Sequence, residues 1–77
     1  MIYSQQLVST AQAVTPNDST VFQAGILYVG TAGDVRVITY GGNTVTFVAV
    51  PAGMTLYVLA TSVLATSTTA SNILVMR

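Results

Sequence analysis

The chain has 77 residues and a formal net charge of zero, and only 5% of its residues are charged, whereas about 25% is usual for a soluble domain. It contains no histidine, cysteine, lysine or glutamate, so its charged residues are Asp18, Asp34, Arg36 and Arg77. This composition argues against disulfides, metal sites, acid–base or nucleophilic catalysis, and neutralisation of nucleic-acid phosphates. We therefore expect no enzyme activity, no cofactor, no metal and no nucleic-acid partner.

Stabilisation of so short a chain needs a source beyond its own core. A domain of this size buries little apolar surface, and small proteins usually add disulfides, a metal or further subunits. Since the first two are missing from the composition, oligomerisation remains. The low charge points the same way, because a surface with few charges is either rich in neutral hydroxyl groups or covered by other subunits. We expect a homo-oligomer; the alternative is a monomer with a neutral, hydroxyl-rich surface.

Neither a membrane span nor a signal peptide is indicated. The stretch 37–76 has no charge, but polar residues, glycine and proline interrupt every window of 18 residues. The N-terminal sequence MIYSQQLVST has neither the basic region nor the apolar region of a signal peptide. We expect no membrane partner, and a protein made in the cytoplasm that is used there or exported only within a larger assembly.

Residues 1–22 are expected to form an N-terminal arm and loop, and residues 23–77 a β-domain. The arm has no clear apolar period, and a short helix over Tyr3 to Ala11 is compatible with it. The following TPNDST segment is a loop, because proline disfavours helix before it and Asn and Asp favour turns. The arm is either a frayed terminus or an extended segment that reaches across a neighbouring subunit, with Ile2, Tyr3 and Leu7 as interface candidates.

The rest of the chain predicts an all-β fold, a small antiparallel β-sandwich or barrel of about six short strands with an extended N-terminal arm. The strands are apolar or alternating runs separated by turn residues. Gly30–Asp34 (GTAGD) is expected to be a hairpin turn and not a phosphate-binding loop, because no lysine and no helix follow it. The expected strands are 25–29, 35–40, 43–50, 54–60, 62–65 and 72–76.

Gly41-Gly42 predicts a two-residue hairpin loop, since both central positions of a type I′ turn need positive φ. This loop would pair Ile38 with Val45 and Arg36 with Phe47. The face expected to point to the core then contains Tyr40, Ile38, Arg36, Val45, Phe47 and Ala49.

Arg36 and Tyr57 are further interface candidates. Structurally, Arg36 would lie over the ring of Phe47 or pair with Asp34. Functionally, it would cross a subunit interface, where arginine is enriched.

Four segments in a fixed order resemble a known family: TPNDST, LYVGTAGDVRV, GGNTVTFVAVPAG and SVLATSTTASNILVM, which lie between Thr15 and Met76, with the resemblance covering most of Thr15 to Val75. They are similar to the small virion proteins of tailed phages and gene-transfer agents that are described as head-spike-base or capsid decoration proteins. The chain departs from the family in Tyr57–Ser62, which lacks the basic residue of many members, so the resemblance carries no charge-based contact over to these residues. No receptor-binding domain follows the last motif, which favours decoration over a spike.

The resemblance implies a β-domain that assembles on the outside of a capsid, and it supplies no catalytic residues. We expect a phage capsid decoration (cement) protein on the outer surface of the head. Its partners would be itself and the major capsid protein, with a homotrimer over local three-fold positions expected first and a vertex pentamer second. The alternatives are the base of a head spike or fibre that presents a receptor- or glycan-binding protein, and a self-assembling scaffold unrelated to phages.

Overall fold

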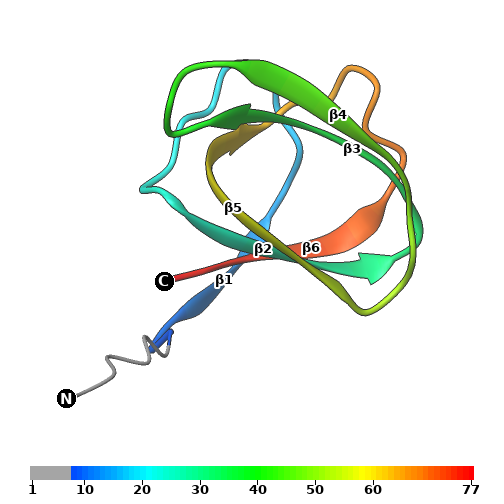
Figure 1. Cartoon of the computed structure of the whole chain (residues 1–77), viewed down its shortest axis with the longest axis horizontal. Helices are drawn as coiled ribbons and strands as arrows, with labels where there is room; N and C mark the ends of the chain where they lie inside the picture. The colour runs from blue at the N-terminus through cyan, green and yellow to red at the C-terminus, as the bar shows by residue number, and fades with distance from the viewer. Residues whose placement is uncertain (1–7) are drawn as a thin grey trace, which may run out of the picture.

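The structure, a computed structural model that describes residues 8–77, is built from strands alone (Figure 1). No helix in this range is long and apolar enough to cross a membrane. The expectation of an all-β antiparallel fold of about six strands is confirmed. The strands are β1 (Ala11–Val14), β2 (Gly25–Thr31), β3 (Gly33–Thr39), β4 (Thr44–Val50), β5 (Met54–Val63) and β6 (Ser71–Met76).

All six strands form one sheet in the order β1-β6-β2-β5-β3-β4. β5 belongs to both halves of this sheet, because its first part pairs with β2 and its last part pairs with β3. In Figure 1, β5 curves from the half that contains β2 and β6 to the half that contains β3 and β4. The sheet therefore folds over itself, and its two halves face each other like the layers of a sandwich.

Two irregularities in β5 produce this bend. Three residues, Tyr57–Leu59, lie opposite the single residue Ile26 of β2. Further along, Thr61 is an extra residue where β5 begins to pair with β3. Bulges of this kind bend a strand and increase its local twist. The predicted strands 54–60 and 62–65 are accordingly one continuous strand that changes partner.

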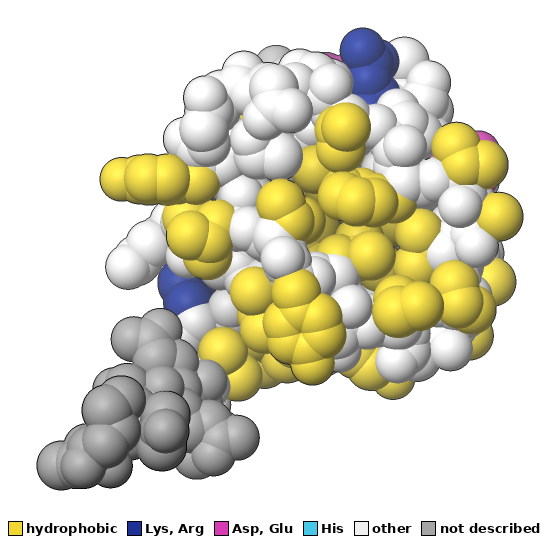
Figure 2. Space-filling view, viewed as in Figure 1, with side chains coloured by type: hydrophobic (Ala, Val, Ile, Leu, Met, Phe, Trp, Pro, Cys, Tyr) yellow, Lys and Arg dark blue, Asp and Glu magenta, His cyan; other side chains and the backbone are white. Residues whose placement is uncertain are grey.

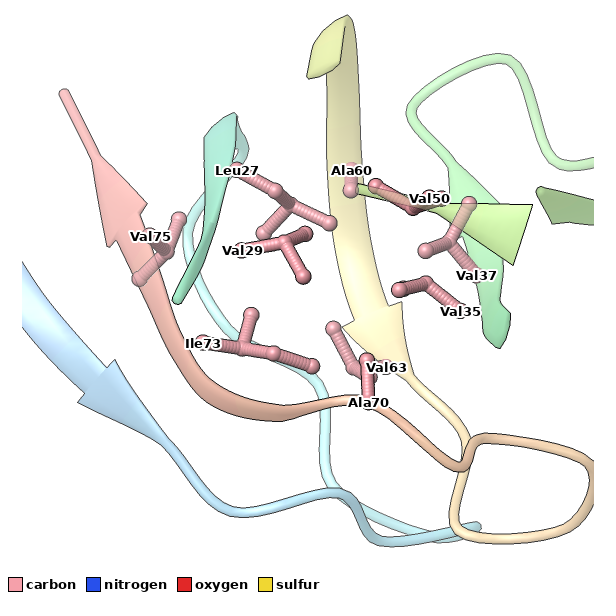
Figure 3. Packing of buried hydrophobic residues seen from close by; sticks show 10 residues of the cluster. All are labelled: Leu27, Val29, Val35, Val37, Val50, Ala60, Val63, Ala70, Ile73 and Val75. Atoms are coloured by element: carbon pink, nitrogen blue, oxygen red, sulfur yellow. The ribbon is translucent and has the colours of Figure 1, made fainter. Parts of the chain in front are cut away.

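The core lies between the two halves of the sheet (Figure 3). Side chains of β2 and β6 point toward those of β3 and β4, and β5 contributes from the bend. Full burial of one such side chain stabilises the fold by about 1.5–3 kcal/mol. The buried cluster consists of Leu27, Val29, Val35, Val37, Val50, Ala60, Val63, Ala70, Ile73 and Val75.

The segment expected to be an arm contributes an edge strand. β1 pairs with β6 from Ala11 opposite Met76 to Val14 opposite Ile73. Val8–Thr10 are not helical, and Ala11 begins a strand, so the described part of the predicted helix is wrong. The interface candidates Ile2, Tyr3 and Leu7 lie outside the described residues.

The turn at Gly30–Asp34 is not a hairpin turn, because β2 and β3 are separated in the sheet by β5. It carries the chain from one half of the folded sheet to the other, as the right-hand side of Figure 1 shows. Gly33 lies directly against the loop before β6, where an added Cβ would be 2.6 Å from the backbone nitrogen of Ala70. The glycine is therefore required by close packing of two backbone segments.

The predicted register of the β3–β4 hairpin is wrong by one residue. Val37 pairs with Val45 and Arg36 with Thr46, so the loop contains three residues, 40–42, instead of two. The amide of Gly42, with φ of 97°, donates to the carbonyl of Thr39 at 2.9 Å, as in a turn that ends in a glycine bulge. A shift of one residue reverses the faces of a strand.

Candidate interaction surface

The loop between β5 and β6, residues 64–70, holds the TPNDST segment in place. The backbone amide of Thr66 donates to Oδ1 of Asp18 at 3.0 Å, and the Thr66 hydroxyl donates to Oδ2 at 2.7 Å. Next to this contact, the amide of Asn17 donates to the carbonyl of Val63 at 2.9 Å. The segment thus lies against the end of β5.

Asp34 binds the same loop from the other side. Its amide donates to Oγ1 of Thr69 at 2.8 Å, and its carbonyl accepts from the amides of Thr69 and Ala70 at 2.8 and 3.1 Å. Its carboxylate Oδ1 accepts from the amide of Ala49 at 2.9 Å. Ala49 has a positive φ of 58° and lies in a bulge of β4, so the carboxylate fixes a backbone conformation that alanine rarely adopts.

These contacts join residues of all four segments that carry the family resemblance. Asp18 comes from the first, Asp34 from the second, Ala49 from the third, and Thr66 and Thr69 from the fourth. Hydrogen bonds connect them into one network around the loop 64–70. Both aspartates accept hydrogen bonds from backbone amides, which gives them a role in folding. Within residues 8–77 no three potential metal ligands lie together.

Asp18 gives the fold a pH dependence that can be measured. Hydrogen bonds from the backbone and side chain of Thr66 lower the pKa of Asp18 below its ordinary value of 3.8. Because the folded pKa is lower than the unfolded one, the stabilisation is present above the unfolded value and is lost as pH falls through the folded value. We expect Asp18→Asn to lose less stability than the wild type between about pH 5 and about pH 2 in denaturant titrations. Equal pH profiles for the two proteins would contradict this.

A shallow apolar groove, the hairpin groove, lies between the β3–β4 hairpin and the first half of β5. Its exposed large apolar side chains are Tyr40, Tyr57 and Leu59, which are 73%, 86% and 51% exposed. The amide of Tyr40 donates to the carbonyl of Leu59 at 2.8 Å, which holds the hairpin end against β5. The lining consists of Thr39, Tyr40, Gly41, Asn43, Val45, Phe47, Tyr57, Val58 and Leu59.

Local backbone geometry explains why these apolar side chains are exposed. Tyr57 and Leu59 lie in the bulge of β5, where the strand bends away from β2. Tyr40 lies in the three-residue hairpin loop. None of the groove residues is charged, and large exposed apolar patches mark interaction sites. One view of the surface shows apolar side chains gathered across its middle, with basic side chains only near its margin (Figure 2).

The sequence identified Tyr57 as an interface candidate, but it placed Tyr40 on the core face and did not single out Leu59. The expectation for Tyr40 is wrong, since its side chain is largely exposed. Tyr40 directly precedes Gly41-Gly42, so a three-residue loop would have assigned it to the turn. Leu59 had no comparable signal, because the bulge that exposes it depends on the pairing of β5 with two strands.

Arg36 lies away from the hairpin groove and close to the loop 64–70. Its amide donates to Oγ1 of Thr68 at 3.0 Å, and its carbonyl accepts from the amide of Leu64 at 2.8 Å. It stands opposite Thr46 on β4, so the expected position across from Phe47 is wrong. The structure therefore does not bring Arg36 and Tyr57 together, since Tyr57 lies toward the other end of β5. A contact of Arg36 with a neighbouring subunit stays a prediction.

A cavity of about 250 Å³ lies between β1 and the segment that follows it. Its walls include Val14, Phe22 and Val75, with Gln12, Asn17 and Thr20 as polar neighbours. None of these side chains titrates near neutral pH, so the cavity offers no general acid or base.

Comparison with known proteins gives one informative likeness. No family model matches the chain, and no curated protein sequence matches it. Among solved structures, the chain is similar to a chain from the capsid of a native gene-transfer-agent (GTA) particle computed with C5 symmetry. The two share 33% sequence identity and a TM-score of 0.81, and the match covers 92% of this chain and 84% of the other.

Proposed function

The chain belongs to the family of small virion proteins of tailed phages and gene-transfer agents, and on this premise we propose that it is a capsid decoration (cement) protein. The observation that carries the proposal is the likeness to a chain of a gene-transfer-agent capsid over 92% of its length. The role is structural and not catalytic, because the chain lacks the side chains that acid–base and nucleophilic chemistry require. Its place is the virion, on the outer surface of the head.

Decoration would stabilise the shell by linkage. A protein that binds the assembled shell and not its free subunits stabilises the assembled state by its own binding free energy. The exposed apolar side chains of the hairpin groove would supply part of that energy, at about 25 cal/mol for each Å² of apolar surface removed from water. Tyrosine suits this role, because aromatic residues are enriched among the residues that dominate binding.

The decoration protein would act as a homo-oligomer with the major capsid protein as its partner. The small core, the absence of disulfides and the exposed Tyr40 and Tyr57 support further burial between subunits. A trimer over local three-fold positions is our first assignment and a vertex pentamer our second.

A head-spike base at the capsid vertices is the second candidate, because the exposed apolar hairpin groove could equally hold another virion protein. A spike base would occupy those positions alone and present another protein.

A cryo-EM map of particles with and without the protein distinguishes these roles. Decoration predicts density over the outer surface of the capsomers and a shell that disassembles at lower temperature when the protein is absent. Density confined to the vertices, with an equally stable shell, would identify a spike base. Particles that carry no such density would overturn both candidates.

Tyr57→Asp is expected to weaken capsid binding by at least about tenfold, because truncating a dominant aromatic contact costs ~2 kcal/mol or more. The fold should be unchanged, since the Tyr57 side chain is 86% exposed. Ala52→Asp is the control: it adds the same charge in the exposed turn Pro51–Gly53, where aspartate is a favoured residue. Binding is measured by sedimentation of the variants with undecorated capsids. Equal loss in both variants would exclude a specific role for the hairpin groove.

A further inference from the structure

We propose that the free edge of β4 pairs with the free edge of β1 in a second copy of the chain, so that the sheet continues from subunit to subunit. The inference rests on the proposed homo-oligomer and names the surfaces that form it. β1 and β4 are the two ends of the strand order, and Figure 1 shows them on opposite sides of the molecule. Each copy would therefore offer one edge to each neighbour.

The hydrogen-bond pattern of β4 shows which backbone groups are available. The amide of Thr39 donates to the carbonyl of Asn43 at 2.9 Å, and the register continues with Val37 opposite Val45 and Val35 opposite Phe47. In an antiparallel pair, alternate residues direct their N–H and C=O groups to the partner strand. Val45 and Phe47 therefore bond to β3. The groups that face the open edge belong to Thr44, Thr46 and Val48.

β1 offers a matching set. The amide of Thr10 donates to the carbonyl of Arg77 at 2.8 Å, and the amide of Arg77 donates back at 3.0 Å. By the same alternation, Gln12 and Val14 bond to β6. The N–H and C=O groups of Ala11 and Ala13 face the open edge of β1.

Within residues 8–77, neither edge strand contains a charged residue or a proline, two features that protect sheet edges from pairing. Short length and bulges also protect edges, and here they limit the length of the open stretch without closing it. β1 reads AQAV and β4 reads TVTFVAV, with neither charge nor proline, and the side chains of Ala11, Ala13, Thr44, Thr46 and Val48 are exposed. The bulge at Ala49 ends the regular part of the β4 edge, so the available stretch, Thr44–Val48, is close in length to β1.

Pairing of the β4 edge with the β1 edge of a second copy fits these edges better than pairing with the β4 edge of a second copy. Pairing of β4 with β4 would be two-fold, would leave both β1 edges free, and could not by itself build a trimer or pentamer. Pairing of β4 with β1 joins different surfaces, which can close into a ring of any number of subunits. Because neither strand is charged, no like charges meet at this contact.

Amide hydrogen exchange of the assembled protein, read by NMR, tests the pairing residue by residue. We expect the amides of Ala11, Ala13 and Thr44 to exchange at least about tenfold more slowly in the oligomer than in a monomeric variant. The amides of Val45 and Phe47 are the internal control, since β3 protects them in both states. Slow exchange at Thr44 and Thr46 with fast exchange at Ala11 and Ala13 would overturn the pairing with β1.

Thr46→Pro supplies the monomeric variant. Proline removes an N–H that faces the open edge and that β3 does not use, and edge strands tolerate it there. Thr46→Lys is the second variant, because lysine on an edge opposes strand addition without changing the backbone. Both should be folded monomers in light scattering with circular dichroism, whereas Thr46→Val should assemble as the wild type does. Assembly of the lysine variant at wild-type strength would overturn the proposal.

The result is independent of the capsid role. A variant that is monomeric but still decorates capsids would show that the pairing exists and that decoration does not need it. Protected edges in a protein that never binds capsids would contradict decoration and leave the pairing standing.

Discussion

Gly33→Ala is expected to remove a large part of the stability of the fold. The Cβ of alanine would lie 2.6 Å from the backbone nitrogen and 2.8 Å from the Cα of Ala70, and both belong to backbone that cannot rotate away. The φ of Gly33, 156°, is also one that L residues rarely adopt. Relieving the clash would separate Asp34 from Thr69 and Ala70 and break hydrogen bonds that each contribute about 0.5–1.5 kcal/mol.

The expected loss for Gly33→Ala is about 3 kcal/mol or more, from strain of about 1–3 kcal/mol and the lost hydrogen bonds. A domain of this length has roughly 4–12 kcal/mol of stability in total, at about 0.05–0.15 kcal/mol per residue. Urea denaturation followed by circular dichroism measures the loss.

Two other glycines separate the clash from the backbone angle. At Gly41 an added Cβ meets nothing closer than Thr39 Oγ1 at 3.8 Å, so Gly41→Ala should be nearly neutral. Gly42 has a φ of 97° and open space around it, so Gly42→Ala should cost only the backbone strain, about 1 kcal/mol. If Gly33→Ala were no worse than Gly42→Ala, the loop 64–70 would not be packed as tightly as the structure shows.

The β3–β4 hairpin shows which structural features the sequence pattern predicts and which it does not. Alternation and Gly41-Gly42 placed the two strands and their turn correctly, because β-branched runs and glycine are local signals. The register depends on whether the loop has two or three residues, and glycine suits both loops. In the observed register the side chains of Val35 and Val37 are buried in the core between the two halves of the sheet. The register is therefore selected by packing against β2 and β6.

β5 and the two aspartates show a second limit. Asp18 and Asp34 were recognised as turn residues, but their partners Thr66 and Ala49 are distant in sequence. The sequence predicts two strands in residues 54–65, and the structure has one strand there that changes its pairing partner. The first part of β5 pairs with β2 and the last part pairs with β3. A strand that bends and pairs with both halves of a sheet does not keep a single alternation of apolar and polar residues along its length. The sequence therefore does not reveal that residues 54–63 form one strand.

Leu27→Ala is expected to cost about 2–5 kcal/mol, because the Leu27 side chain is fully buried between the halves of the sheet and its removal leaves a cavity. With so small a core, the remaining stability would be marginal at physiological temperature. Thermal and urea denaturation measure the change. A loss below about 1 kcal/mol would mean that the two halves of the sheet can close over the cavity.

Leu59→Ala makes the same chemical change on the outside of the bend in β5. The Leu59 side chain is 51% exposed in the hairpin groove, so its truncation should cost less than about 1 kcal/mol of stability. If the hairpin groove is a binding surface, Leu59→Ala should weaken capsid binding while Leu27→Ala weakens it only as far as it unfolds the protein. The pair therefore separates the two roles of apolar residues in this chain. If Leu59→Ala bound capsids as strongly as the wild type, the hairpin groove would not be the surface that contacts the shell.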